Sequence, residues 1–146
     1  MENPITQLEQ LTLNGRSKSF LKETAKWSFF LSIVGFISLG FLVLLAIFAG
    51  AIFNDIPEAK QVPFDLGMVM TIIYLIMAIL YFFPIFYLFK FSKKMKLALL
   101  TKNDETLSDA FEMLKSHYKF IGVFTIILLS LYALIFIISM MGVALA

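Results

Sequence analysis

Three long runs without a charged residue constrain this chain more than any other feature. Residues 27–53, 66–89 and 120–146 contain no Asp, Glu, Lys, Arg or His. Each run exceeds the roughly 20 residues that a helix needs to cross a bilayer. Only 15% of the residues are charged, whereas charged residues make up about a quarter of a typical soluble domain. We therefore expect an all-α integral membrane protein with three transmembrane helices.

The basic residues indicate how these helices are oriented. Of the 12 Lys and Arg residues, all but Lys60 either precede the first run or lie between the second and third runs. Basic residues in short loops favour the cytoplasmic side, and three spans then place the C-terminus outside. The expected parts are a cytoplasmic N-terminal segment 1–26, the first span 27–53, an outer loop 54–65, the second span 66–89, a cytoplasmic helical hairpin 90–119 and the third span 120–142.

The connector 90–119 contains two apolar stripes at helical spacing. A polar turn at 102–105 separates them, and Asn103 in this turn is suited to cap the second arm. Two stripes joined by a short turn predict an antiparallel hairpin that extends the second and third spans into the cytoplasm. Its arms either stand upright and pack together or lie flat on anionic lipid. The predicted packing residues are Phe91, Met95, Leu99, Leu107, Phe111, Leu114 and Tyr118, with Leu99 near Leu107, Met95 near Phe111, and Phe91 near Leu114 and Tyr118.

Capping residues predict where the other helices begin. Asn3 and Pro4 suit the start of a short helix that ends near Leu11. Ser17 or Ser19 is expected to cap the helix that continues into the first span. Asp65 or Pro63 is expected to start the second.

Three lysines of the connector are candidates for binding. Lys93, Lys94 and Lys96 fall off the apolar stripe of the first arm. A basic cluster beside a membrane attracts anionic lipid, so these residues are possible lipid or partner contacts. The alternative is that they form the solvated exterior of the hairpin.

Other residues in or beside the spans have structural interpretations. Pro84 removes a backbone donor from the second span and is either a hinge or a proline of the kind that membrane helices tolerate. His117, the single histidine, has no Cys or carboxylate partner in its surroundings, which favours a structural role. Close helix approach is predicted by the small residues of the first span: Ser28, Ser32, Gly35, Gly40, Ala46 and Gly50.

The chain lacks the usual signatures of catalysis. It has no cysteine, and it contains no phosphate-binding glycine loop, nucleophile elbow, paired catalytic carboxylates or zinc pattern. We expect no enzyme activity, no cofactor, no metal and no nucleic acid. The expected partners are membrane lipids and either further copies of the chain or another membrane protein.

Three functions remain open from the residues alone. The first is a structural, assembly or docking subunit that acts through the cytoplasmic hairpin. The second is an oligomeric pore or small transporter lined by Thr71, Tyr74, Ser130 and Tyr132. The third is a membrane anchor that binds anionic lipid through the connector lysines.

The stretch from Pro84 to Gly122 also carries a resemblance. Its recognisable residues are Phe91-Ser92-Lys93, Ala98-Leu99, Asn103-Asp104, Leu107, Ala110-Phe111, Leu114-Lys115 and Lys119-Phe120-Ile121-Gly122. Over about residues 10 to 140, the chain resembles a family of small bacterial membrane proteins catalogued only as a domain of unknown function. The resemblance implies a bacterial inner-membrane protein of no known activity and carries over no catalytic residues, while the three runs make the expected protein multi-pass.

Overall fold

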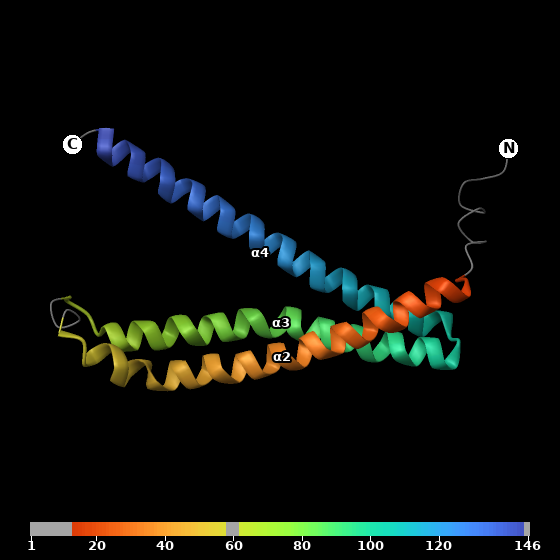
Figure 1. Cartoon of the computed structure of the whole chain (residues 1–146). Coiled ribbons are helices and arrows are strands. Elements are labelled where there is room, and N and C mark those ends of the chain that lie inside the picture. Colours follow the sequence, from red (N-terminus) through yellow and green to blue (C-terminus); the bar gives the residue numbers. More distant parts are fainter. Residues whose placement is uncertain (1–12, 58–61, 145–146) are drawn as a thin grey trace.

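The computed structural model describes residues 13–57 and 62–144, and this part of the chain folds into three long helices (Figure 1). They are α2 (Gly15–Asn54), α3 (Leu66–Thr101) and α4 (Asp104–Ala144). Each is long and apolar enough to cross a membrane. The prediction of an all-helical chain with three candidate spans is therefore confirmed. The short helix predicted from Asn3 to Leu11 lies outside the described residues.

All three helices are longer than a bilayer requires. They contain 40, 36 and 41 residues, which corresponds to about 55–60 Å at 1.5 Å per residue. The hydrocarbon core of a bilayer is about 30 Å thick. Each helix therefore has one part that fits a membrane and one part that extends beyond it.

The helix starts are set by side-chain caps. Asn14 caps α2, because its Oδ1 accepts the backbone N–H of Ser17 at 2.8 Å. The predicted caps Ser17 and Ser19 are wrong, since both residues already lie within the first two turns, where the backbone is helical. Asp65 caps α3 as predicted and accepts the N–H of Met68 at 2.8 Å.

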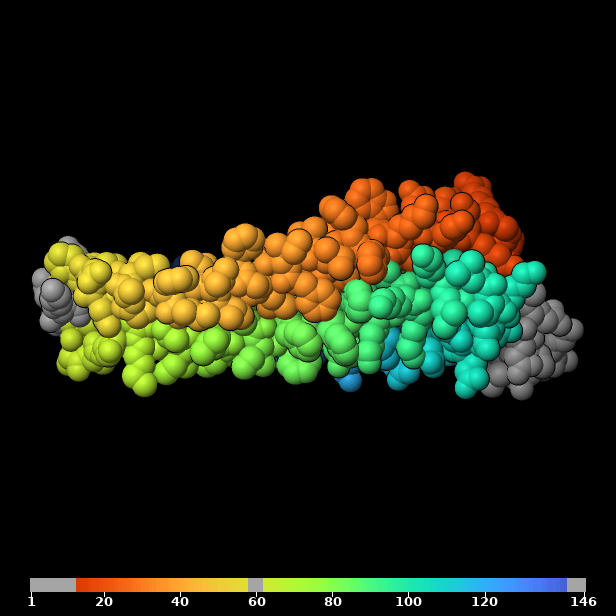
Figure 2. Space-filling model, turned by 90° about the horizontal axis from the view of Figure 1, so that it is seen from below, coloured from red at the N-terminus to blue at the C-terminus, as the bar shows by residue number. Residues whose placement is uncertain are grey.

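Helices α2 and α3 lie side by side as an antiparallel pair (Figures 1 and 2). Ten covered positions of α2 alternate between steps of four and three residues, which is the spacing of left-handed coiled-coil packing. Small residues occupy many of these positions, so the helices approach closely. Gly40 stands apart from the predicted set, because it is exposed on α2 and a Cβ there would meet nothing within 4 Å. The ten positions of this repeat are Leu21, Ala25, Ser28, Ser32, Gly35, Leu39, Leu42, Ala46, Ala49 and Phe53.

The backbones of the two helices approach each other closely near the loop that joins them. A Cβ atom at Gly67 would lie 2.8 Å from both the Cα and the carbonyl oxygen of Gly50. The backbone N–H of Gly67 also donates to Oδ1 of Asn54 at 3.1 Å. Only a glycine at position 67 permits this approach of one backbone to another.

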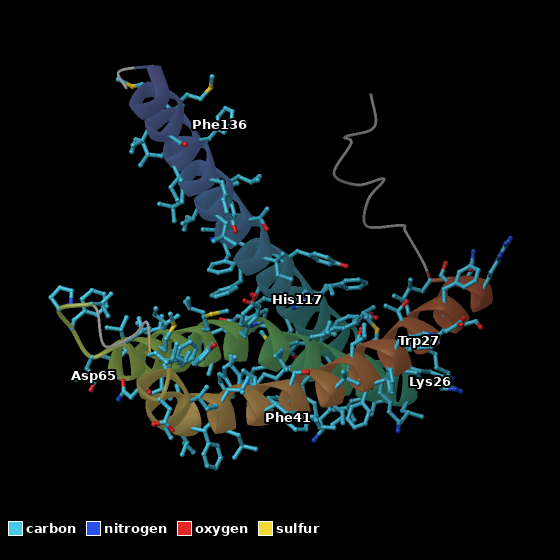
Figure 3. The ribbon with its side chains drawn as sticks, turned by 60° about the vertical axis from the view of Figure 1, so that its left-hand side comes forward. Lys26, Trp27, Phe41, Asp65, His117 and Phe136 are labelled. Atoms are coloured by element: carbon cyan, nitrogen blue, oxygen red, sulfur yellow. The ribbon has the colours of Figure 1, made fainter. Side chains whose placement is uncertain are left out.

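Helix α4 follows a different course. It packs on α3 near their shared turn and then diverges from the α2–α3 pair, so that Phe136 stands well away from both helices (Figures 1 and 3). Every residue from Thr125 to Met141 is exposed. Within the described chain, no other helix covers this apolar part of α4.

Candidate functional site

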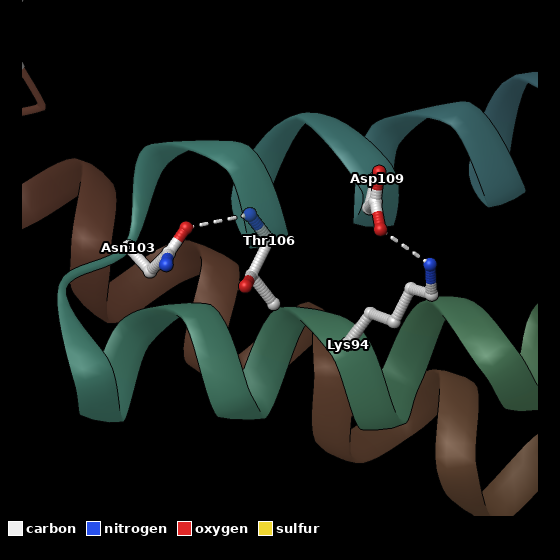
Figure 4. A network of polar contacts seen from close by, with 4 residues as sticks. All are labelled: Lys94, Asn103, Thr106 and Asp109. Carbon is white, nitrogen blue, oxygen red and sulfur yellow. Dashed lines mark hydrogen bonds and ion pairs between the residues drawn. The ribbon is translucent and has the colours of Figure 1, made fainter.

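The turn between α3 and α4 forms the tip of an antiparallel hairpin. Lys102 ends α3 in the left-handed conformation, with φ of 53°. Asn103 caps α4, because its Oδ1 accepts the N–H of Thr106 at 2.9 Å (Figure 4). Its carbonyl oxygen accepts the N–H of Leu107 at 3.1 Å. The predicted cap at Asn103 is confirmed.

A buried cluster holds the hairpin together. Phe91 and Met95 of α3 and Ala110 of α4 are 0% exposed, and Ala25 of α2 completes the cluster at 4%. Burial of large apolar side chains is the dominant favourable term outside a membrane. The half-buried residues that pack around the cluster are Leu21, Leu88, Leu99, Leu107, Met113 and Leu114.

Five of the predicted packing residues meet in this cluster, and two do not. Phe91, Met95, Leu99, Leu107 and Leu114 belong to it. Phe111 and Tyr118 are 43% and 65% exposed and lie outside it. Successive helical residues are about 100° apart, so Ala110 occupies the inward position and turns its larger neighbour Phe111 away.

Helix α2 also packs against the buried cluster of the hairpin, and the sequence-based prediction of two packed arms did not include it. Leu21 and Ala25 pack in the cluster although they precede the first uncharged run. They continue the four-and-three spacing of the α2 seam. That repeat was the sequence signal that could have placed the N-terminal part of α2 against the hairpin.

The three candidate lysines point to different neighbours. Lys94 Nζ lies 2.6 Å from Oδ2 of Asp109 on α4 (Figure 4). The two side chains are 36% and 47% exposed, so solvent screens this ion pair and its contribution is at most about 1 kcal/mol. Lys93 and Lys96 instead line a groove between α3 and α2.

This groove, which we call the lysine groove, has a volume of about 570 Å³. Four of its lining residues are lysines, two from each helix, and the rest are apolar except for Ser92. Lys93 also lies over the Phe89 ring, with 4.6 Å from Nζ to the ring centroid, a favourable cation–π contact. The lining residues are Lys22, Ala25, Lys26 and Phe29 of α2, and Ser92, Lys93, Lys96, Leu99 and Leu100 of α3.

Pro84 and His117 form a contact between α3 and α4. Helix α3 continues through Pro84, and His117 Nδ1 lies 2.8 Å from the Pro84 carbonyl oxygen. A carbonyl oxygen only accepts, so Nδ1 carries the proton in this bond. The contact gives His117 the structural role that was expected, close to the point where α4 diverges (Figure 3). The hinge at Pro84 stays a prediction.

The hydroxyl residues of the spans do not share a surface within one chain. Thr71 Oγ1 donates to the Gly67 carbonyl at 2.9 Å, and Ser130 Oγ donates to the Ile126 carbonyl at 2.8 Å. Tyr132 is 68% exposed on the diverging part of α4. A pore lined by these residues and Tyr74 would need several chains. In the described part of the chain, no group of three or more His, Cys, Asp or Glu residues is placed to hold a metal ion.

Comparison with known families adds one finding. Residues 66–140, which hold α3 and nearly all of α4, match the Family of unknown function DUF5362. The chain belongs to the DUF5362 family. This membership confirms the expected family of unknown function. No curated protein and no solved structure matches the chain. The DUF5362 match contains both arms of the hairpin and stops short of α2, which supplies half of the lysine groove.

Proposed function

We propose that this DUF5362 protein is a non-enzymatic subunit of the bacterial inner membrane that assembles with a second copy of itself. The observation that carries the proposal is the course of α4, which leaves the other helices and is exposed from Thr125 to Met141. A span without a helix neighbour gains only lipid contacts, whereas a neighbouring helix adds close packing and hydrogen bonds.

One flank of α4 suits a second copy. Five exposed residues recur there at seven-residue spacing and run from the hairpin into the apolar span. A seven-residue repeat keeps one flank in contact with a partner in a left-handed helix pair. Hydroxyl side chains within a span also favour hydrogen bonds to a neighbouring helix. These residues, the α4 stripe, are Phe111, Tyr118, Thr125, Tyr132 and Ser139.

The hairpin takes part in the proposed contact because the α4 stripe begins on it. Phe111 and Tyr118 lie before the third uncharged run, and within the described residues they are 43% and 65% exposed. The continuity of α3 from Leu66 to Thr101 supports an upright hairpin, since the span and the arm are one helix. We place the N-terminus and the hairpin in the cytoplasm and the C-terminus outside, as the lysine distribution favours.

Crosslinking of single cysteines tests the assembly. The natural chain has no cysteine, so each substitution introduces one thiol. T125C and Y132C are expected to give disulfide-linked dimers when native membranes are mildly oxidised, because both positions lie on the α4 stripe. L134C lies on the opposite side of α4 and is also exposed, at 55% for Leu134. It is expected to crosslink several-fold less on non-reducing gels.

Uniformly weak crosslinking at all three positions would contradict the proposal, because it would mean that lipid surrounds α4. Adducts whose mass differs from that of a dimer would also contradict it and would indicate a different membrane protein as the partner.

Thiol labelling tests the orientation. We expect V62C, in the loop between α2 and α3, to react with a membrane-impermeant maleimide on intact spheroplasts. K102C, at the tip of the hairpin, is expected to react only after the membrane is permeabilised. The reverse pattern, read by mass shift on gels, would overturn the proposed orientation.

A further inference from the structure

We infer that the lysine groove between α2 and α3 binds the phosphate-bearing headgroup of an anionic phospholipid. The inference is independent of the proposed assembly, because the groove lies between two helices of one chain and uses none of the α4 stripe.

Charge is the first argument. Lys22 and Lys26 are four residues apart on α2, and Lys93 and Lys96 are three apart on α3, so each pair shares one side of its helix. The residues that line the groove include no acid. Glu23 lies on the adjoining surface of α2, where it shares a second, more open hollow with Lys22 and Lys26. The groove is therefore a concentrated positive site that attracts phosphate.

The apolar walls are the second argument. Ala25 and Phe29 of α2 and Leu99 and Leu100 of α3 line the same groove as the lysines. Ser92 adds a hydroxyl and is 4% exposed. A small hydrated anion uses only the lysines, whereas a phospholipid also covers apolar surface with the first part of its acyl chains. The lining therefore fits an anionic amphiphile better than a free ion.

The level of the groove along the helices is the third argument. Lys26 directly precedes the uncharged run that begins at Trp27 (Figure 3), and Phe29 lies inside that run. On α3, Lys93 follows shortly after the run that ends at Phe89. The groove thus begins beside the ends of two apolar runs, where headgroups meet a chain that spans a bilayer, and extends from there along the hairpin.

Lys94, the third lysine predicted as a possible contact, does not line the groove. Lys94 faces α4, where Asp109 neutralises it at 2.6 Å. Lysine content alone therefore does not define the site. The arrangement of α2 against α3 selects Lys93 and Lys96 and adds Lys22 and Lys26, which are distant in sequence.

Lipid binding to the full chain tests the inference. The purified protein is titrated with phosphatidylglycerol in mild detergent, and native mass spectrometry records the bound lipid. The groove variant replaces its four lysines with glutamine and is expected to lose affinity by at least about tenfold, which corresponds to about 1.4 kcal/mol. Its substitutions are K22Q, K26Q, K93Q and K96Q.

A control variant of equal net charge separates the groove from general electrostatic attraction. It replaces four exposed lysines outside the groove and is expected to bind phosphatidylglycerol nearly as the natural chain does. An equal loss in both variants would overturn the inference, and so would undiminished binding by the groove variant. The control substitutions are K18Q, K102Q, K115Q and K119Q.

A single substitution at an exposed position tests the groove with less risk of unfolding the protein. Leu100 lines the groove and is 72% exposed, so L100E introduces a negative charge without disturbing the buried cluster. Circular dichroism is expected to show unchanged helix content, while phosphatidylglycerol binding falls. Unchanged binding with unchanged helix content would overturn the inference.

Competition with inorganic phosphate identifies the source of the ligand. We expect millimolar phosphate to leave phosphatidylglycerol bound, because phosphate makes no apolar contacts. Displacement of the lipid by phosphate at concentrations comparable to the lipid would overturn the lipid assignment and indicate a site for free phosphate compounds.

Discussion

Phe91→Ala is expected to lower the free energy of unfolding by about 3–5 kcal/mol, the usual cost of removing a large aromatic side chain from a core. Phe91 is 0% exposed and lies in the buried cluster with Met95 and Ala110. Its loss leaves a cavity where all three helices meet, and the alanines at positions 25 and 110 are too small to fill it. Reversible unfolding of the monomer in mixed detergent micelles measures the change.

Phe111→Ala is the matched control. Phe111 is the same residue type on the same hairpin, but it is 43% exposed. Its truncation is expected to cost less than about 1 kcal/mol in the monomer, as is usual for surface positions. Equal losses for the two variants would contradict the position of Ala110 at the centre of the cluster and would support the inward Phe111 that the apolar stripe predicted.

Gly67→Ala is expected to destabilise the protein by about 1–3 kcal/mol, the range for forcing extra atoms into a packed interface. The new Cβ would lie 2.8 Å from the Gly50 backbone, which cannot rotate away as a flexible side chain would. We expect α2 and α3 to separate near their loop and the hydrogen bond from Gly67 N–H to Asn54 to weaken. The same unfolding assay in micelles gives the magnitude.

Gly40→Ala provides the comparison for this second prediction. Gly40 lies within α2, and a Cβ there meets nothing within 4 Å. Replacement of a helical glycine by alanine in open space is expected to stabilise the chain by about 0.5–1 kcal/mol. A loss of stability for Gly40→Ala as large as that for Gly67→Ala would show that glycine itself, rather than the contact with Gly50, accounts for the effect.

The helices were predictable because their signals are local. The uncharged runs indicated three spans, and Asp65 and Asn103 precede their helices in the position where a short polar side chain reaches a free amide. The cap of α2 was missed because several residues near position 15 are suitable caps. From the sequence, Asn14, Ser17 and Ser19 are equally suitable as the cap. In the structure, Asn14 has the extended backbone of a cap residue.

The interior of the hairpin was predictable only in part. Ala110 and Phe111 are both apolar and adjacent, and residue size favours the phenylalanine as the core residue. Ala110 is 0% exposed and packs with Phe91, Met95 and Ala25 of α2, whereas Phe111 is turned outward. Whether Ala110 or Phe111 faces the cluster depends on the packing of helices that are remote in sequence. The local pattern of the connector does not show this packing.

The lysine groove was missed for a similar reason. Lys93, Lys94 and Lys96 were grouped because all three fall off the apolar stripe of the first arm. The helix rotates Lys94 toward Asp109 and leaves the other two beside Lys22 and Lys26 of α2. The seven-residue repeat of small residues in α2 was the available signal, since it continues through Ala25 and predicts contact along the whole helix.

The divergence of α4 gives the molecule a taper. At the end that holds the turn between α3 and α4, the three helices pack together, whereas toward the opposite end α4 stands apart from the α2–α3 pair (Figure 1). In a bilayer, such a wedge displaces more area from one leaflet than from the other. We therefore expect the angle between α4 and the pair, and with it the contact between His117 and Pro84, to depend on the shapes of the surrounding lipids.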